Sequence, residues 1–225
     1  MPILRTKNED FFKKWSPEMA YVLGFFAADG NMIKNKRGAH FVSFYSTDKE
    51  LLEKVKLNLK SNLKISTRKI NEKYPDHKQS YVLQIGSKEI FKDLIDLGMT
   101  PNKSLTIRMP SVPKKYLPHF LRGYFDGDGH VSTSTYQKKD RKNKSTIIIT
   151  GFTSGSNKFL QGLWKVLKKH RIIEGGTLYR TLGYHLCFSA NDSLRLYNFM
   201  YQKEKILYLG RKKAIFEQYF NILGV

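Results

Sequence analysis

The apolar and polar positions of this chain predict the same series of elements twice. Residues 21–30 (YVLGFFAADG) and 120–129 (FLRGYFDGDG) are apolar, aromatic stretches that predict buried helices. Each stretch has a glycine at its fourth position and ends in Asp-Gly. A repeated element of this kind indicates that the chain contains two copies of one structural unit.

The first half continues with two predicted strands separated by the basic tip KNKR at 34–37. An amphipathic helix follows, then alternating strands in 63–74 and 80–87, and a short helix that Gly98 should end. The amphipathic helix is predicted by the helical spacing of Leu51, Leu52, Val55 and Leu59.

The second half repeats this order. Strands are predicted in 129–137 and 145–154, separated by the basic tip KKDRKNK, and a helix follows in 157–170. Residues 176–190 predict a hairpin, which should turn at Gly183, and a last helix follows in 192–202. Each half therefore reads αββαββα, which predicts an α+β fold of two pseudo-symmetric repeats, each with a four-stranded antiparallel sheet.

The repeats are expected to form two domains, at 1–107 and 118–225, with a linker at 108–117. Pro110, Pro113 and Pro118 prevent a continuous helix in this region. Pro118 suits the first turn of the second buried helix, and Ser16-Pro17 suits the start of the first.

The small residues of the two buried helices lie four positions apart. Gly24 and Ala28, and likewise Gly123 and Gly127, fall on one helical face. A glycine inside a helix costs about 1 kcal/mol relative to alanine, so its presence at matching positions needs a physical reason. Close backbone approach supplies one, and we expect the two helices to pack against each other through these faces. The flanking bulky residues should fill the cores: Tyr21, Leu23, Phe25, Phe26, Leu121, Tyr124 and Phe125.

The two helices, if parallel, bring the acids Asp29 and Asp128 together at their carboxyl ends. These acids repel each other and face the negative ends of the helix dipoles, so a cation is needed there. A hard divalent ion such as Mg²⁺ prefers carboxylate oxygen, water and phosphate. Gly30 and Gly129 are expected to end the helices in a left-handed conformation.

The charge of the chain narrows the class of partner. The chain has 40 basic and 19 acidic residues, a net charge of +21, which favours nucleic acid as the partner. An acidic membrane surface and a general solubility bias are the alternatives, but the lysines gather on hairpin tips and strands. No apolar run reaches the ~18 residues of a membrane span, and the first residues resemble no signal peptide. The single cysteine excludes an internal disulfide.

The two stretches resemble the signature helices of the LAGLIDADG homing endonucleases in their single-chain, two-repeat form, and the likeness covers essentially the whole chain. It implies that Asp29 and Asp128 bind metal and drive cleavage, and that the backbone carbonyls of Ala28 and Gly127 help to hold the metal. The earlier acid of the family motif is absent from the first stretch, which has Ala27, and present in the second as Asp126.

The resemblance implies a site-specific DNA endonuclease that needs Mg²⁺, with Mn²⁺ or Ca²⁺ as other occupants, and that cuts both strands across the minor groove. Each half should also bring one basic residue to the centre, Lys103 from the first and Lys212 from the second. Arg211 or Lys213 are substitutes for Lys212. Weaker candidates are the hydroxyls that end the second strand of each half: Ser46, Thr47, Thr153 and Ser154.

The two sheets should form a saddle that reads DNA in the major groove through alternate side chains, while the basic tips contact phosphates. For residues 177–181 the alternation leaves open which set faces DNA, and each strand residue has a solvated outer face as its alternative role. The residues expected to contact DNA are Lys34, Lys36, Arg37, Lys64, Ser66, Arg68 and Gln84 in the first half, and Ser132, Ser134, Tyr136, Lys138, Lys139, Arg141, Lys142, Tyr179 and Arg180 in the second.

Other functions of the same fold are the main alternatives, namely an intron RNA maturase or a DNA-binding protein that does not cleave. Because both aspartates are intact, the nuclease is favoured. We expect a monomer that needs no protein partner and no membrane, with double-stranded DNA as its partner and the host intron RNA as an additional candidate. Its expected place is intracellular, in a prokaryotic cytoplasm or an organelle that carries the intron. The termini show no protein-splicing blocks, which favours an intron-encoded protein over an intein.

Overall fold

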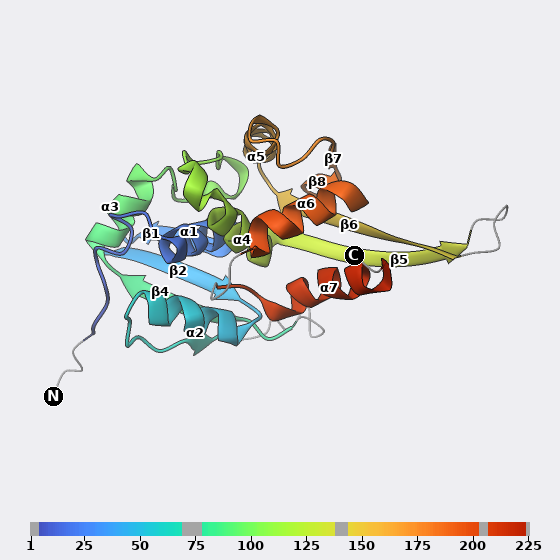
Figure 1. The fold of residues 1–225 in the computed structure, drawn as a ribbon. Coiled ribbons are helices and arrows are strands. Elements are labelled where there is room, and N and C mark those ends of the chain that lie inside the picture. The colour runs from blue at the N-terminus through green and yellow to red at the C-terminus, as the bar shows by residue number, and fades with distance from the viewer. Residues whose placement is uncertain (1–4, 69–77, 138–143, 203–206, 224–225) are drawn as a thin grey trace. The chain divides into compact units, whose positions relative to one another are not determined.

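The structure is a computed structural model that describes residues 5–68, 78–137, 144–202 and 207–223. The chain divides into two compact units (Figure 1). Unit 1 comprises residues 1–103 and 110–127, and unit 2 comprises residues 104–109 and 128–225. These units differ from the repeats predicted from the sequence, because the repeat boundary falls before the second signature helix and the unit boundary falls at its end.

Unit 1 contains both signature helices and a four-stranded antiparallel sheet of order β1-β2-β4-β3. Helix α1 contacts β1 and β2, α2 contacts β2 and β4, and α3 contacts β2. Alternate strand residues that include Val42, Phe44 and Leu83 are fully buried beneath these helices. The elements are α1 (Pro17–Asp29), β1 (Gly30–Lys34), β2 (His40–Ser46), α2 (Lys49–Asn58), β3 (Ser66–Thr67), β4 (Tyr81–Gly86), α3 (Lys88–Asp96) and α4 (Leu117–Asp128), of which the last residue belongs to unit 2.

Unit 2 has an equivalent sheet of order β5-β6-β8-β7. Helix α5 contacts β6 and β8, α6 contacts β6, and α7 contacts β5 and β6. Strands β5 and β6 are 9 and 11 residues long, against 5 and 7 for β1 and β2, so this hairpin extends further than its counterpart. The elements are β5 (Gly129–Gln137), β6 (Lys144–Ser154), α5 (Asn157–Lys169), β7 (Thr177–Arg180), β8 (Tyr184–Phe188), α6 (Ala190–Tyr201) and α7 (Gly210–Leu223).

Serine side chains begin three of the helices. Ser16 Oγ accepts a hydrogen bond from the Met19 amide at 3.1 Å, and Pro17 occupies the first turn, as expected from the sequence. Ser156 Oγ caps α5 and also donates to the carbonyl of Ile107 at 2.7 Å, which holds the segment 104–109 against unit 2. Each cap satisfies an amide that the first helical turn leaves without a partner.

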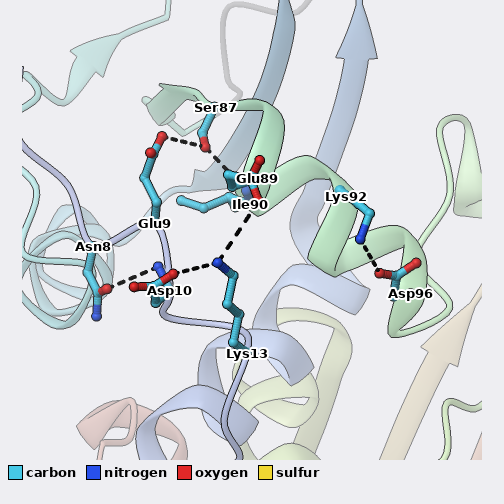
Figure 2. A network of polar contacts seen from close by, with 9 residues as sticks. All are labelled: Asn8, Glu9, Asp10, Lys13, Ser87, Glu89, Ile90, Lys92 and Asp96. Carbon is cyan, nitrogen blue, oxygen red and sulfur yellow. Dashed lines mark hydrogen bonds and ion pairs between the residues drawn. The ribbon is translucent and has the colours of Figure 1, made fainter.

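The cap of α3 also fastens the N-terminal segment to unit 1, as Figure 2 shows. Ser87 Oγ accepts from the Ile90 amide at 3.2 Å and donates to the Glu9 carboxylate at 2.8 Å. Lys13 pairs with Asp10 at 2.6 Å within the same network. The contact between Ser87 and Glu9 joins residues 78 positions apart in the sequence.

The predicted fold class is confirmed, with two differences in the elements. The predicted strand at 63–74 forms only β3 within its described part, and residues 69–77 lie outside the described residues. Helix α7 was not predicted, although Phe216, Tyr219 and Phe220 are apolar, helically spaced and buried. Across the described residues, no helix is long and apolar enough to cross a membrane.

Candidate active site and nucleic-acid interface

The two signature helices touch through their glycines, as predicted. A Cβ atom built on Gly24 would lie 2.0 Å from the carbonyl oxygen of Phe120, and one built on Gly123 would lie 2.0 Å from that of Tyr21. No side chain fits at such distances, so the backbones of α1 and α4 are in direct contact inside unit 1.

The contacts advance along both helices in the same direction, so α1 and α4 are parallel. Near the carboxyl ends, a Cβ atom built on Gly127 would lie 2.5 Å from the Cβ atom of Ala28 and 3.0 Å from Asp29 Oδ2. The half-buried Asp29 therefore lies at the end of the helix pair. Asp128, also half-buried, follows Gly127 in the chain and is the last residue of α4.

The expected left-handed ending is wrong for Gly30. Its backbone is extended, with φ −90° and ψ 154°, and α1 passes directly into β1. A Cβ atom at Gly30 would lie 2.1 Å from the ring of Phe26, so close packing is the reason for glycine here. Gly129 likewise is the first residue of a strand, β5.

A buried lysine lies at each signature sequence. Lys103 is 4% exposed, and its Nζ donates to the carbonyl of Ala28 at 3.3 Å and lies 5.6 Å from the ring centroid of Phe26. Lys212 is 6% exposed, and its Nζ donates to the carbonyl of Gly129 at 2.6 Å. The negative end of a helix dipole stabilises a cation in this position.

The substitutes considered for Lys212 are placed differently. Arg211 is exposed, and Lys213 pairs with Glu217 at 2.6 Å. That ion pair raises the pKa of Lys213, with burial acting against it.

The oxygen atoms at the end of α1 suit a hard divalent cation. The Asp29 carboxylate and the Ala28 carbonyl belong to the ligand types that Mg²⁺ and Ca²⁺ prefer, and the same carbonyl accepts a hydrogen bond from Lys103. No group of three or more His, Cys, Asp or Glu side chains that could hold a metal occurs in the part of the chain that the structure describes.

A family model described as a LAGLIDADG-like domain matches residues 16–97 and 116–197. The chain belongs to the LAGLIDADG family. Its fold is similar to that of the meganuclease I-SmaMI bound to uncleavable DNA, with a TM-score of 0.61 and 14% identity over 90% of this chain and 89% of that one. The I-LtrWI LAGLIDADG homing endonuclease bound to target DNA gives a TM-score of 0.59 and 13% identity over 96% and 92% of the two chains. At these identities the likeness shows the fold alone.

Curated relatives come from archaea. The uncharacterized protein MJ0398 of Methanocaldococcus jannaschii is 29% identical over 135 residues, which are 59% of this chain and 45% of that protein. A probable translation initiation factor IF-2 of Thermococcus kodakarensis is 35% identical over 99 residues, 42% of this chain and 7% of that protein. The chain thus spans less than half the length of these relatives.

A buried polar cluster links the two LAGLIDADG helices, and the sequence reading missed it. Tyr21 Oη donates to Asp126 Oδ2 at 2.6 Å, and both residues are at most 3% exposed. Arg122 is 1% exposed, contacts His119 Nδ1 at 2.9 Å and lies 5.5 Å from the Tyr21 ring centroid. The available signal was the helical spacing of the polar residues 119, 122 and 126 along a helix predicted to be buried.

The sheet of unit 1 has an open face, which we define as the face carrying its exposed alternate residues. Ser66 and Gln84 lie on it, because Ile65, Leu83 and Ile85 are buried on the other face. Lys64 and Arg68 are exposed and share the alternation of Ser66, and the Arg68 guanidinium lies 5.1 Å from the Tyr45 ring centroid. The tip residues Lys34, Lys36 and Arg37 are also exposed.

The open face of unit 2 carries Ser132, Ser134 and Tyr136, which alternate with the buried Val131. The register also separates the two candidates of β7. Tyr179 pairs with His185 and stacks on its ring at 5.1 Å, so it lies on the open face. Arg180 pairs with Tyr184 on the opposite face, where Leu178 meets the buried Leu186. Lys138, Lys139, Arg141 and Lys142 lie outside the described residues.

Two of the four hydroxyls that end the second strands accept hydrogen bonds from backbone amides two residues later. Ser46 Oγ accepts from the Asp48 amide at 3.0 Å, and Ser154 Oγ accepts from the Ser156 amide at 3.1 Å. Thr153 Oγ1 lies 3.4 Å from His185 Nδ1, and Thr47 is exposed.

His130 lies on the open face of β5, because it shares the alternation of Ser132, and it had not been singled out from the sequence. Its Nε2 lies 3.8 Å from the Cys187 sulfur, across Gly151 of the intervening strand. Burial, and then the charges of His185 and Lys212, lower the pKa of His130. The ring is therefore neutral at pH 7.

Proposed function

We propose that this protein is a site-specific endonuclease that cuts both strands of a long double-stranded DNA site and requires a divalent metal ion. The observation that carries the proposal is the carboxyl end of α1, where the buried Lys103 donates to the carbonyl of Ala28, the residue immediately before the half-buried Asp29. The second repeat has the same residue types in Asp128 and Lys212. The DNA bound in the similar structures of I-SmaMI and I-LtrWI, and the charge of +21, support DNA as the substrate.

Asp29 and Asp128 would hold Mg²⁺, with help from the carbonyls of Ala28 and Gly127. Mn²⁺ and Ca²⁺ are other occupants, and I-SmaMI has been solved with uncleaved DNA in the presence of calcium ions. A bound divalent ion supplies Lewis acidity toward the phosphate and lowers the pKa of a water. Each aspartate would serve one DNA strand.

Lys103 and Lys212 would place positive charge where negative charge develops on the phosphate during cleavage. A preorganised donor in a site shielded from water stabilises such charge far more than one in bulk water. The low exposure of both lysines fits this role.

The open faces of the two sheets would read base edges in the major groove, and the basic tips would contact phosphates. Two scissile phosphates facing each other across a minor groove ~6 Å wide would give a staggered break. Two units that each cover about one helical turn would occupy roughly 20 base pairs. We propose a monomer, because one chain supplies both LAGLIDADG helices.

The proposal is tested by incubating the protein with Mg²⁺ and a plasmid library of randomised duplexes, followed by sequencing of the cut ends. We expect double-strand breaks at a small set of related sites, with a constant stagger. EDTA should stop cleavage and leave binding to the same sites intact. Failure to cut any duplex with Mg²⁺ or Mn²⁺ would refute the nuclease, and selective binding without cutting would favour a non-cleaving protein of this fold.

A further inference from the structure

Two isoleucines of β6 lie on the open face of unit 2. Ile147 and Ile149 are 37% and 39% exposed, whereas Ile148 between them is 1% exposed on the opposite face. The register places Ile147 opposite Ser134 and Ile149 opposite Ser132. Two large apolar side chains thus stand among hydroxyl groups, on the face proposed to meet DNA.

The open faces of the two units differ in charge. Arg68 and Gln84 occupy that of unit 1. In unit 2, the described residues of β5 to β8 place neither lysine nor arginine on the open face, since Lys144 and Arg180 share the alternation of the opposite face. The described part of this surface offers methyl and hydroxyl groups, with the imidazoles of His130 and His185, instead of lysine or arginine side chains.

The bases differ in what they present to such a surface. In the major groove guanine offers two acceptors that suit arginine, adenine suits asparagine or glutamine, and thymine presents its C5-methyl group, which favours apolar contact. Exposed isoleucines on a face whose described residues include no lysine or arginine therefore match thymine better than guanine.

We propose that Ile147 and Ile149 recognise thymine methyl groups, so that the half of the DNA site bound by unit 2 is rich in A·T pairs. This inference rests on the proposed function. Residues two apart on one strand face are separated by ~6.6 Å, and successive bases of one DNA strand by ~3.4 Å. The two contacted thymines should therefore lie two base steps apart where β6 follows the groove.

The test begins with duplexes selected from a random library by the wild-type protein. Each thymine of the selected site is then replaced by deoxyuridine, which keeps the hydrogen-bonding groups and lacks the methyl group. We expect about fourfold weaker binding at each of two thymines in one half, the effect of one buried methyl group. Ile147→Ser and Ile149→Ser should each abolish the sensitivity at one of these thymines, and Ile147→Val should retain it.

Ile95→Ser is the matched control, because Ile95 is 38% exposed but lies on helix α3. It should leave the deoxyuridine response unchanged, and thermal unfolding of each variant checks that the fold persists. Selective binding that is insensitive to deoxyuridine, or a sensitivity that both serine variants keep, would overturn this inference and leave the nuclease standing. Failure of the wild-type protein to select any sequence would overturn both.

Discussion

The ammonium group of Lys103 donates a hydrogen bond to the carbonyl oxygen of Ala28, the residue immediately before Asp29, at 3.3 Å. In the second repeat, Lys212 donates to the carbonyl of Gly129, the residue immediately after Asp128, at 2.6 Å. Each repeat therefore places a buried cation on a backbone carbonyl next in sequence to its signature acid, near the carboxyl end of a helix whose dipole favours positive charge.

The two lysines should matter more for cleavage than for DNA binding. Lys103→Met and Lys212→Met keep the length of the side chain but remove its charge, and we expect each to lower the cleavage rate by about 10²–10³-fold. Binding should change far less, because a protein of this charge has many other cations. Lys92→Met, at the exposed pair with Asp96, is the control and should cut normally. Equal loss of binding and cleavage would contradict the assigned role.

The glycine contact between α1 and α4 should tolerate no side chain. Gly24→Ala would place a methyl group 2.0 Å from a backbone oxygen, so the helices would have to separate. We expect a loss of about 3 kcal/mol or more in the free energy of unfolding, measured by urea titration. Gly210→Ala is the matched control, since its Cβ atom would meet nothing within 4 Å. An unchanged urea midpoint for Gly24→Ala would show that the helices do not pack as described.

The Tyr21 hydroxyl should stabilise the helix pair through Asp126. Tyr21→Phe removes the donor at 2.6 Å from a carboxylate that is 3% exposed, and we expect a cost of about 1–3 kcal/mol in unfolding free energy. Tyr136→Phe, on an exposed tyrosine, should cost nothing measurable. If both substitutions proved equally neutral, the buried hydrogen bond would contribute no net stability.

Asp192 should make unit 2 sensitive to acid. Burial raises the pKa of Asp192, but the backbone amides of Glu174 and Gly175 and the Arg195 guanidinium together outweigh it, so the pKa is lowered. A lowered carboxyl pKa contributes stability that is complete above the unfolded value of about 3.9 and is lost as pH falls through the folded value. Asp192→Asn should therefore cost about 1–3 kcal/mol at pH 7 and flatten the acid limb of the stability curve.

The control for Asp192→Asn is measured in the same way, as unfolding free energy against pH. Glu174→Gln alters an exposed carboxylate beside the same arginine and should leave the stability at pH 7 nearly unchanged. An acid limb as steep in Asp192→Asn as in the wild-type protein would assign the pH dependence to other groups.

The signature helices and the sheets were predictable because their determinants are local. The spacing of Gly24 and Ala28 predicted the contact face, and alternation around Leu83 and Ile85 predicted the exposed position of Gln84. Strand alternation divides the residues of a strand into two sets but does not say which set faces the helices. The pairing of β7 with β8 was needed to place Tyr179 and Arg180 on their faces.

Other features depend on contacts between distant segments. The conformation of Gly30 follows from the Phe26 ring beside it, which a sequence pattern does not reveal. The cluster around Asp126 requires Tyr21, 105 positions away, as its donor. Helix α7 falls outside the αββαββα repeat, so the repeat itself gave no reason to expect it.

The most direct test of the central claim is the cleavage of one cognate duplex by Asp29→Asn and Asp128→Asn, with Asp96→Asn as a control on an exposed acid. Both strands are end-labelled and followed in Mg²⁺, and binding is measured separately in EDTA. We expect each signature variant to lose double-strand cleavage while binding the duplex as the wild-type protein does, and Asp96→Asn to cut normally. Double-strand cleavage at the wild-type rate by either signature variant would contradict the central claim.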